Sequence, residues 1–556
     1  MKGRLIPLFA TVGLPSALAF LSAALIWLWL APYPWPVNPS PYPWPTNPYA
    51  WWVRWLAAAL ALGLISFASS ELPLVRSTRA WMERRALLLV GAGMAFVFIY
   101  GWASALVRFI SFDPFPGSTE LAWYGSLCWN TWQGRIYEWM LGHFLAVHVS
   151  LVPALLLPLC PPGVGMPGYL LGQSLLFVLP ALPLFLLARQ HLAPFPSLLL
   201  AWAYLVLPGI FSQHSAGAKE SSSIALPLAC AFLFYRQQRL RPFLVAITLG
   251  ALAIKEYYAP VFGLFGLLAW RDRRSLPWVI GPWWVALLST TLAYGVILPF
   301  FRQAFPSPHA DPYFWGFTSS YGHLGDSPQA IVGRLLSDPV GLLAAVLDRP
   351  QLLFLYELLL PFLFVLPWGA PEVLFALWEL MISLPARSDY VLLLGGGHAA
   401  LASTALLAGT MGSLGWLSRA SGSSQALVRS LAAAVLALSA ASPVTVASAL
   451  HPIHQVRQPR AALAEAVALV PPDVPVAAPP GVLPHLVNRP DVYYLWGLRE
   501  DLVNATLAAV IFYEPPGQLA EDWEVDLLRA LRQHASYRLA YERDGVSLFL
   551  RDSPGS

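Results

Sequence analysis

Two lysine–glutamate pairs stand out among the residues that could do chemistry in this sequence. Lys219 precedes Glu220 and Lys255 precedes Glu256, in a chain whose only other lysine is Lys2. All other basic side chains except histidine are arginines, so a compact ammonium group recurs at two places, where it could hold a phosphate as a point charge. With so few lysines, coincidence is a competing explanation.

These residues also have structural explanations. Glu220 stands at the expected start of a helix, where a carboxylate favours the positive end of the helix dipole. Lys255–Glu256 falls within an apolar stretch, where a buried ion pair adds little net stability, so function and structure compete evenly. His148 also lies in an apolar stretch and is more often a satisfied core residue there, while turn chemistry explains much of the pattern around His323.

A polar and aromatic segment, residues 109–142, offers carboxylates that could act as a general base. Asp113, Glu120 and Glu138 lie in it together with Arg135. A carboxylate beside a lipid phosphate could deprotonate a sugar-acceptor hydroxyl. The competing explanation is that a carboxylate in a wet loop is usually only solvated.

The elements that must position these residues are apolar helices. Of the 556 residues, 57% are hydrophobic and only 11% are charged, against about 25% charged in an ordinary soluble domain. Apolar runs near the ~20 residues needed to cross a bilayer recur from Leu5 to Leu450 and then stop. We therefore expect a multi-pass protein of the cytoplasmic (inner) membrane with about 12–14 membrane helices.

Basic clusters between the apolar runs predict the topology. The positive-inside rule places 236–241 and 271–274 in the cytoplasm. The stretch between them, 242–270, is too long for one crossing and too short for two, so we expect two short helices with 255–260 at their tip. Counting every apolar run as a crossing puts 236–241 on the wrong side, and the simplest way to satisfy the rule is that the run 143–160 does not fully cross.

Three parts are expected along the chain. Residues 1–70 would form an N-terminal helical hairpin with a proline-rich external loop. Residues 71–450 would form the transmembrane core, with external loops at 109–142 and 301–350. In 451–556, helix-like and strand-like segments alternate, which predicts a small extracytoplasmic α/β domain. The predicted fold class is thus an all-α polytopic membrane protein with a small C-terminal α/β soluble domain.

Cysteine spacing and charge argue against several classes of protein. Cys128, Cys160 and Cys230 lie in or beside apolar segments and match no metal or redox motif, so we expect neither a disulfide framework nor a zinc site. The net charge of +4 is small for this length and its basic residues are scattered, which argues against nucleic-acid binding. No metal ligands are predicted, and a divalent metal stays an open alternative that no pattern supports.

Several stretches, in this order, resemble an uncharacterised family of bacterial and archaeal predicted membrane proteins that is grouped with the GT-C glycosyltransferases. The matching stretches are TELAWYGSLCWNT at 119–131, HVSLVP at 148–153, LAIKEYYAP at 252–260, YGHLGDSPQAI at 321–331, LLPFLFVLPWGAPEVLFAL at 359–377 and the tail element at 464–495. The resemblance covers about residues 86–555, implies a GT-C-like core, and puts Glu120 on the family's first acidic position. Three positions depart from the family's pattern. Gly125 stands where the family has a second acid, and Val147 replaces the family's residue before the histidine of the HFSP-like segment. GAKESS at 217–222 stands in place of an FHPE-like motif.

The resemblance implies an inverting glycosyltransferase that uses a polyprenyl-phosphate sugar donor on the outer face of the membrane. Glu120, with Asp113 as second candidate, would deprotonate the acceptor hydroxyl. Candidate phosphate- and substrate-binding residues are Arg135, His148, Lys219, Glu220, Lys255, Glu256 and His323. The expected partners are the polyprenyl-phosphate sugar and membrane lipids, and no cofactor or protein partner is identified.

Two other classes of function stay open. Charged residues within the membrane and broken helices also occur in transporters. The replaced polar positions of the family would suit a catalytically inactive structural subunit of a membrane complex.

Overall fold

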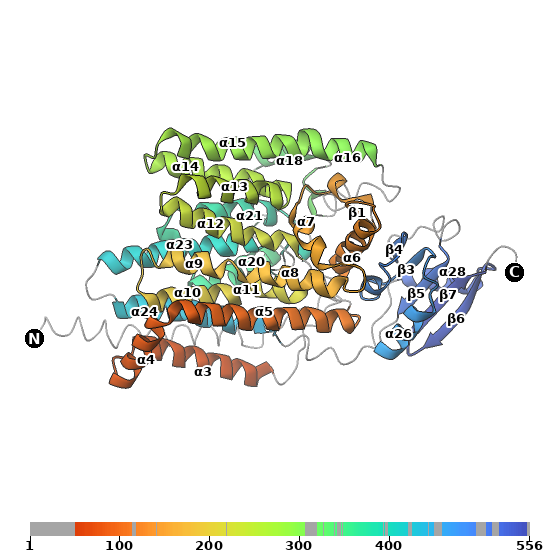
Figure 1. Ribbon diagram of the computed structural model, residues 1–556, viewed down its shortest axis with the longest axis horizontal. Coiled ribbons are helices and arrows are strands. Elements are labelled where there is room, and N and C mark those ends of the chain that lie inside the picture. Colours follow the sequence, from red (N-terminus) through yellow and green to blue (C-terminus); the bar gives the residue numbers. More distant parts are fainter. Residues whose placement is uncertain are drawn as a thin grey trace, which may run out of the picture.

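The computed structural model describes residues 50–113, 118–140, 142–217, 219–305, 320–325, 327–338, 340–341, 346, 348–387, 389–392, 394, 398–420, 425–442, 444–446, 448–449, 459–495, 507–513 and 522–552. The predicted first helix and proline-rich repeat lie outside these residues. The described part is a bundle of roughly parallel helices with a small sheet at one end (Figure 1).

The chain enters the bundle through α3 (Ala50–Ser69), α4 (Pro73–Arg84) and α5 (Ala86–Ile110). Pro73 begins α4, where its missing N–H costs nothing. The buried Arg79 of α4 donates a 2.7 Å hydrogen bond to the carbonyl of Ala68, so the basic helix is fixed against the end of α3. α5 is a 25-residue apolar helix that is long enough to cross a membrane.

The rest of the bundle alternates long helices with short, broken ones. Its middle consists of α8 (Met166–Val178), α9 (Ala181–Ala188), α10 (Pro194–Val206), α11 (Pro208–Ala216), η4 (Glu220–Ile224), α12 (Ala225–Arg236), α13 (Leu240–Ala253), η5 (Glu256–Gly263), α14 (Leu264–Arg271), α15 (Leu276–Leu292), η6 (Ala293–Ile297, a π turn) and α16 (Leu298–Ala304). It continues through α18 (Pro328–Ser337), α20 (Arg349–Leu359), η7 (Leu360–Phe362), η8 (Leu366–Gly369), α21 (Val373–Ser383), α22 (Asp389–Leu392), α23 (Ala400–Ala420) and α24 (Gln425–Ala441).

Four helices among the described residues are long and apolar enough to span a bilayer: Ala86–Ile110, Met166–Ala188, Leu276–Ala304 and Ala400–Arg419. A fifth candidate is the pair Pro194–Val206 and Pro208–Ser215, which is bent by 46°. The bend occurs where Pro208 holds Leu207 in an extended conformation. The chain is thus a multi-pass membrane protein, while the total of 12–14 helices stays a prediction.

The two topological irregularities predicted from charge are confirmed. Residues 242–270 form α13 and α14, two short helices with the 3-10 turn η5 between them. Residues 143–160 form only short pieces, namely β2 (Gly142–His143), η2 (Phe144–Ala146), α7 (Val152–Leu156) and η3 (Leu157–Leu159). Neither region contains a helix long enough to cross alone.

The C-terminal part is a five-stranded mixed sheet with order β4-β3-β5-β7-β6. Its elements are α26 (Arg460–Leu469), β3 (Val476–Ala478), η10 (Leu483–His485), β4 (Val492–Tyr494), β5 (Ala509–Tyr513), α28 (Asp522–Gln533), β6 (Tyr537–Arg543) and β7 (Val546–Arg551). β3 pairs in parallel with β4 and β5, whereas β7 pairs antiparallel with β5 and β6. The predicted helix and four strands are confirmed, while β6 and α28 were not predicted and the exact domain boundaries stay a prediction.

Candidate functional site

The helix α6 (Ser118–Trp132) lies between the bundle and the sheet and carries Glu120 in its first turn (Figure 1). The segment 109–142, expected as an external loop, therefore has a helix at its centre. After α6, the strand β1 (Glu138–Trp139) pairs antiparallel with β2 in a short hairpin whose strands have two residues each. Most residues of α6 between Glu120 and Asn130 are buried, which explains why a segment of mixed polarity forms a stable helix here.

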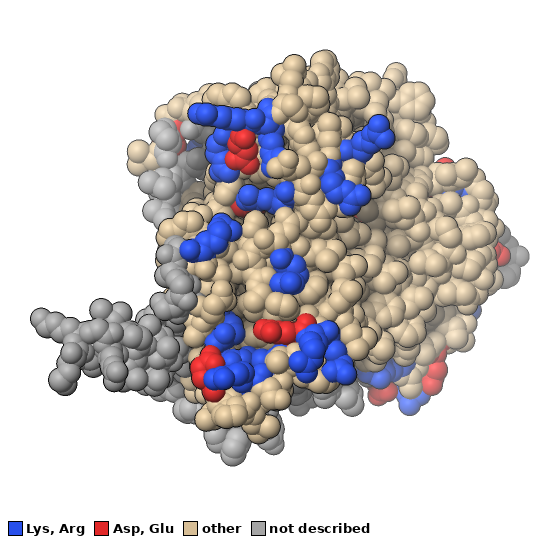
Figure 2. All heavy atoms as spheres, turned by 60° about the vertical axis from the view of Figure 1, so that its left-hand side comes forward, with Lys and Arg blue, Asp and Glu red and all other residues tan. Residues whose placement is uncertain are grey.

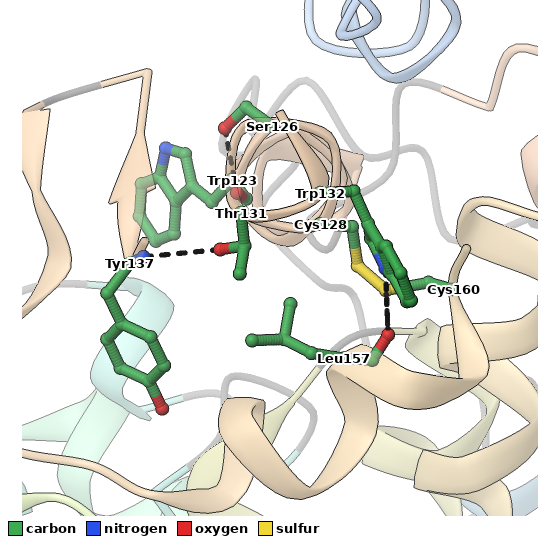
Figure 3. The surroundings of a disulfide bond; sticks show 8 residues. All are labelled: Trp123, Ser126, Cys128, Thr131, Trp132, Tyr137, Leu157 and Cys160. Carbon is green, nitrogen blue, oxygen red and sulfur yellow. Dashed lines mark hydrogen bonds between the residues drawn. A yellow bond between two sulfur atoms is a disulfide. The ribbon is translucent and has the colours of Figure 1, made fainter. Parts of the chain in front are cut away.

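A disulfide between Cys128 and Cys160 fastens α6 to the end of η3 (Figure 3). The expectation that these cysteines form no disulfide was wrong, because residues 32 positions apart are brought to a Cα–Cα distance of 6.1 Å, within the range that a disulfide bridges. The indole N–H of Trp132 donates to the carbonyl of Leu157 at 3.2 Å beside it. Two independent attachments thus hold the C-terminal half of α6.

Glu120 forms a buried ion pair with Lys219. Lys219 follows α11 through a turn at Gly217, whose φ of +107° favours glycine, and precedes η4. Both side chains are at most 9% exposed. The pairing joins the predicted base to one of the two lysine–glutamate pairs.

The second lysine–glutamate pair lies next to the first. Lys255 Nζ is 3.7 Å from Glu220 Oε1, and Glu256 Oε1 is 3.4 Å from the ring Nδ1 of His148. Glu256 also accepts the backbone N–H of Val149 at 3.0 Å. We call Glu120, His148, Lys219, Glu220, Lys255 and Glu256 the polar cluster.

Only part of the polar cluster can be reached from solvent. The side chains of Lys255 and His148 are 19% and 23% exposed, whereas those of Glu220 and Glu256 are 1% exposed. The cluster thus offers one ammonium and one imidazole to a ligand, backed by buried carboxylates.

Three other predicted site residues have different surroundings. Asp113 is paired with the buried Arg108 at 3.9 Å. Arg135 lies over the ring of Trp129, 5.2 Å from its centroid, at the far end of α6 from Glu120. His323 is half-buried in the turn that precedes α18.

Two polar residues beside the cluster, the buried Glu379 and the half-buried His398, were not predicted. Glu379 of α21 accepts a hydrogen bond from the hydroxyl of Tyr258 at 3.0 Å and one from the N–H of Ala402 at 2.6 Å. His398 stacks on Tyr257, with ring centroids 6.1 Å apart. The signal that could have identified Glu379 is a carboxylate within an apolar run, the same signal that singled out Lys255 and Glu256.

The C-terminal sheet packs directly on the helix that carries Glu120. Tyr494 of β4 donates a 3.0 Å hydrogen bond to the carbonyl of Thr119. His485 stacks on Phe109 with ring centroids 4.5 Å apart and donates from Nε2 to the carbonyl of the same residue at 2.8 Å. Burial raises the pKa of Tyr494 and lowers the pKa of His485 to about 4.

Gly125 lies at the same contact. A Cβ at this position would be 2.8 Å from Cγ2 of Val487 and 3.3 Å from Met166. Glycine therefore allows α6 and the sheet to approach closely where the resembling family has an acid. Within the described residues, no group of three His, Cys, Asp or Glu side chains is placed to hold a metal ion.

Comparison with known proteins adds a family and two similar structures. No curated protein matches the sequence significantly. Crystal structures of ArnT from Cupriavidus metallidurans, one bound to undecaprenyl phosphate and one in the apo state, align with TM-scores of 0.47 and 0.45 at 13% identity, and each alignment covers 82% of this chain and 98% of that one. Residues 117–548, which contain the whole polar cluster and all of the sheet except the end of β7, match the family described as predicted membrane protein (DUF2079). The chain therefore belongs to this family of predicted membrane proteins, as its motifs had indicated.

Proposed function

We propose that this protein is a membrane glycosyltransferase of the GT-C type, which transfers a sugar from a polyprenyl-phosphate donor to an acceptor hydroxyl on the outer face of the membrane. The observation that carries the proposal is the meeting of Glu120 with Lys219, Glu220, Lys255, Glu256 and His148 beside the C-terminal sheet. A carboxylate next to accessible cationic groups is what base-assisted displacement of a phosphate requires.

Glu120 is the proposed general base. Its carboxylate accepts the proton of the acceptor hydroxyl while that oxygen attacks the anomeric carbon of the donor. The bond between the anomeric carbon and the phosphate oxygen breaks, and the electron pair leaves with the lipid phosphate, so the configuration at carbon is inverted. Lys219 orients the carboxylate through the ion pair, and the hydrogen bond from Tyr494 to Thr119 holds the first turn of α6.

Lys255 and His148 are the proposed ligands of the donor phosphate. They are the accessible members of the polar cluster. Negative charge accumulates on the phosphate as its bond to the sugar breaks, so a positive charge at this point lowers the barrier. Glu220 and Glu256 keep these two side chains in position when no donor is bound.

Two observations support placing the reaction on the outer face. Disulfides persist in oxidising compartments, and the Cys128–Cys160 bond is attached to the helix that carries Glu120. The opposite end of the bundle carries mainly basic side chains among its charged groups (Figure 2), as expected of a cytoplasmic face.

The test is native mass spectrometry of the purified full-length protein, followed by a transfer assay with a panel of polyprenyl-phosphate sugars. A co-purified polyprenyl-phosphate lipid and transfer that is lost in Glu120→Gln would support the proposal. Absence of binding and transfer for every donor in the panel, with a correctly folded protein, would contradict it.

Transport is the second candidate, favoured by the broken helices. The 46° bend between α10 and α11 and the 3-10 turn η5 put irregular backbone next to buried charges, an arrangement that transporters use for substrate sites. Uptake of a labelled solute into proteoliposomes, without any transfer of sugar, would favour transport over glycosyl transfer.

A further inference from the structure

A basic cavity lies at the end of the bundle opposite the sheet. It is formed by two tight turns, one between α12 and α13 and one between α14 and α15, and each contains a residue in the left-handed region, Gln238 with φ 59° and Arg273 with φ 52°. The cavity has a volume of about 680 Å³. Its lining residues are Arg236, Gln238, Asp272, Arg273, Arg274, Ser275 and Trp278.

The acidic groups near this cavity are already engaged. Arg236 is neutralised by an ion pair with Glu372. Asp272 accepts a 2.9 Å hydrogen bond from the hydroxyl of Tyr235 and pairs with Arg271 at 2.8 Å.

The remaining two arginines of the cavity keep their positive charge. Neither Arg273 nor Arg274 has a carboxylate within ion-pair distance in the part of the chain that the structure describes. The cavity therefore carries an uncompensated charge of two guanidinium groups, which suits a phosphate.

Arg274 is held in place before any ligand binds. Its guanidinium lies 5.1 Å from the ring centroid of Tyr235 and 5.6 Å from that of Trp278. Trp278 is 7% exposed, so it forms a rigid wall. Stacking on aromatic rings restricts the side chain while leaving its N–H groups free to donate to an anion.

The surface beside the cavity is apolar. Trp270, Leu276 and Trp284 of α14 and α15 are 72%, 67% and 63% exposed. In a membrane protein such side chains face lipid, and tryptophan concentrates near the headgroups. A ligand with acyl chains can therefore lie along α15 while its headgroup enters the cavity, an option that a soluble anion lacks.

We propose that this cavity binds the headgroup of an anionic phospholipid from the cytoplasmic leaflet, with Arg273 and Arg274 donating to its phosphate. Basic pockets between membrane helices on the cytoplasmic side are suited to such headgroups. The site is independent of the polar cluster and of the reaction proposed for it.

The test uses the full-length protein in nanodiscs and in native mass spectrometry, with phosphatidylglycerol as probe and phosphatidylcholine as reference. The double variant Arg273→Gln/Arg274→Gln should weaken phosphatidylglycerol binding by about tenfold to thirtyfold, because each arginine near the membrane surface contributes about 1 kcal/mol. The matched control, Arg84→Gln/Arg85→Gln, removes the same charge from α4, outside the cavity, and should change binding less than about twofold.

Three outcomes would overturn the proposal. Equal loss of binding in both double variants would mean that the basic surface attracts lipid without a specific site. Displacement of bound lipid by inorganic phosphate at matched concentration would assign the cavity to a soluble anion. If the glutamine variant unfolds, Arg273→Lys/Arg274→Lys is measured instead, and phosphatidylglycerol binding equal to that of the unchanged protein in this folded, equally charged variant would exclude specific guanidinium contacts.

Discussion

Lys255 Nζ lies 3.7 Å from Oε1 of Glu220. This contact connects the two lysine–glutamate pairs of the sequence. In neither pair does the lysine form an ion pair with the glutamate that follows it. Lys219 forms an ion pair with Glu120, and Glu256 pairs with His148. The result is a set of crossed ion pairs that ties α6, η4 and η5 together, so a charge removed at one position leaves a defined partner uncompensated at another.

Replacing Glu120 by Gln should lower the turnover of glycosyl transfer by about 10²–10⁴-fold, because general-base catalysis typically contributes that much. Binding of the donor lipid by the folded variant should be nearly unchanged, since the amide keeps the shape of the side chain, although stability should fall because Lys219 loses its carboxylate. The measurement is the rate of transfer with saturating donor, together with a separate binding titration.

Two neighbouring carboxylates serve as controls for that variant. Asp113→Asn should reduce stability rather than turnover, because Asp113 pairs with the buried Arg108. Glu138→Gln, on the hairpin after α6, should retain activity. Full activity of Glu120→Gln with an inactive but folded Asp113→Asn would transfer the role of base to Asp113.

The two lysines of the polar cluster should behave differently. Lys255→Ala is expected to weaken binding of the phosphate lipid, because its ammonium is partly accessible. Lys219→Ala should chiefly destabilise the fold, by about 3–5 kcal/mol, since it leaves Glu120 buried without its cation. Lipid titration and thermal unfolding of both variants distinguish these effects, and equal loss of donor affinity with no loss of stability in Lys219→Ala would contradict the assignment.

The Cys128–Cys160 bond should contribute about 3–4 kcal/mol to stability, from the loss of chain entropy in a closed loop of this length. Cys128→Ser/Cys160→Ser should unfold at lower temperature, whereas Cys230→Ser, at the free cysteine of α12, should not. Mass spectrometry of the alkylated protein counts the free thiols. Finding three alkylated cysteines without prior reduction would show that the bond does not form.

Local sequence patterns predicted much of the architecture, and the physical reason differs from one element to the next. The apolar run at 86–107 can satisfy its backbone in a membrane only as a helix, and α5 is observed there. The two short helices of 242–270 were predicted because basic clusters flank this stretch on both sides and its length lies between that of one membrane crossing and that of two. By contrast, β6 is largely exposed and lacks a clear apolar alternation, so its pattern did not indicate a strand.

The candidate site was predictable as a set of residues but not as a set of pairs. An ionisable side chain in an apolar stretch signals itself because its burial is expensive, which is why Lys219 and Lys255 were selected. Adjacent residues gave no sign that each lysine would pair with a glutamate from another element. The disulfide was missed for the same reason, because contact between Cys128 and Cys160 depends on how α6 meets η3.

The stability of the C-terminal contact should depend on pH through His485. Burial lowers its pKa to about 4, below the value of about 6.5 for a free histidine. The unfolded state then binds the proton more readily, so stability is complete above about pH 6.5 and falls by about 1–3 kcal/mol as the pH decreases to 4. His485→Phe should flatten this part of the unfolding profile, and an unchanged slope in this variant would contradict the role of His485.

Gly125→Ala should destabilise the contact between α6 and the sheet by about 1–3 kcal/mol, because the added methyl group overlaps Val487. The second change Val487→Ala should recover most of that loss by making room. Thermal unfolding of the two single variants and the double variant gives the coupling energy. Strictly additive effects would mean that the two positions do not touch.

The sheet shares its apolar core with α6 and the residues flanking it, since Phe112, Ala122 and Met140 belong to the same buried cluster as Leu463 and Val487. A fragment that begins at residue 459 would therefore expose the surface that α6 normally covers. The same dependence restricts how relatives can recombine: a chimera that exchanges the tail alone would pair mismatched surfaces. The described residues of 109–140 and 459–552 thus depend on one apolar core, although more than 300 residues of chain separate the two segments.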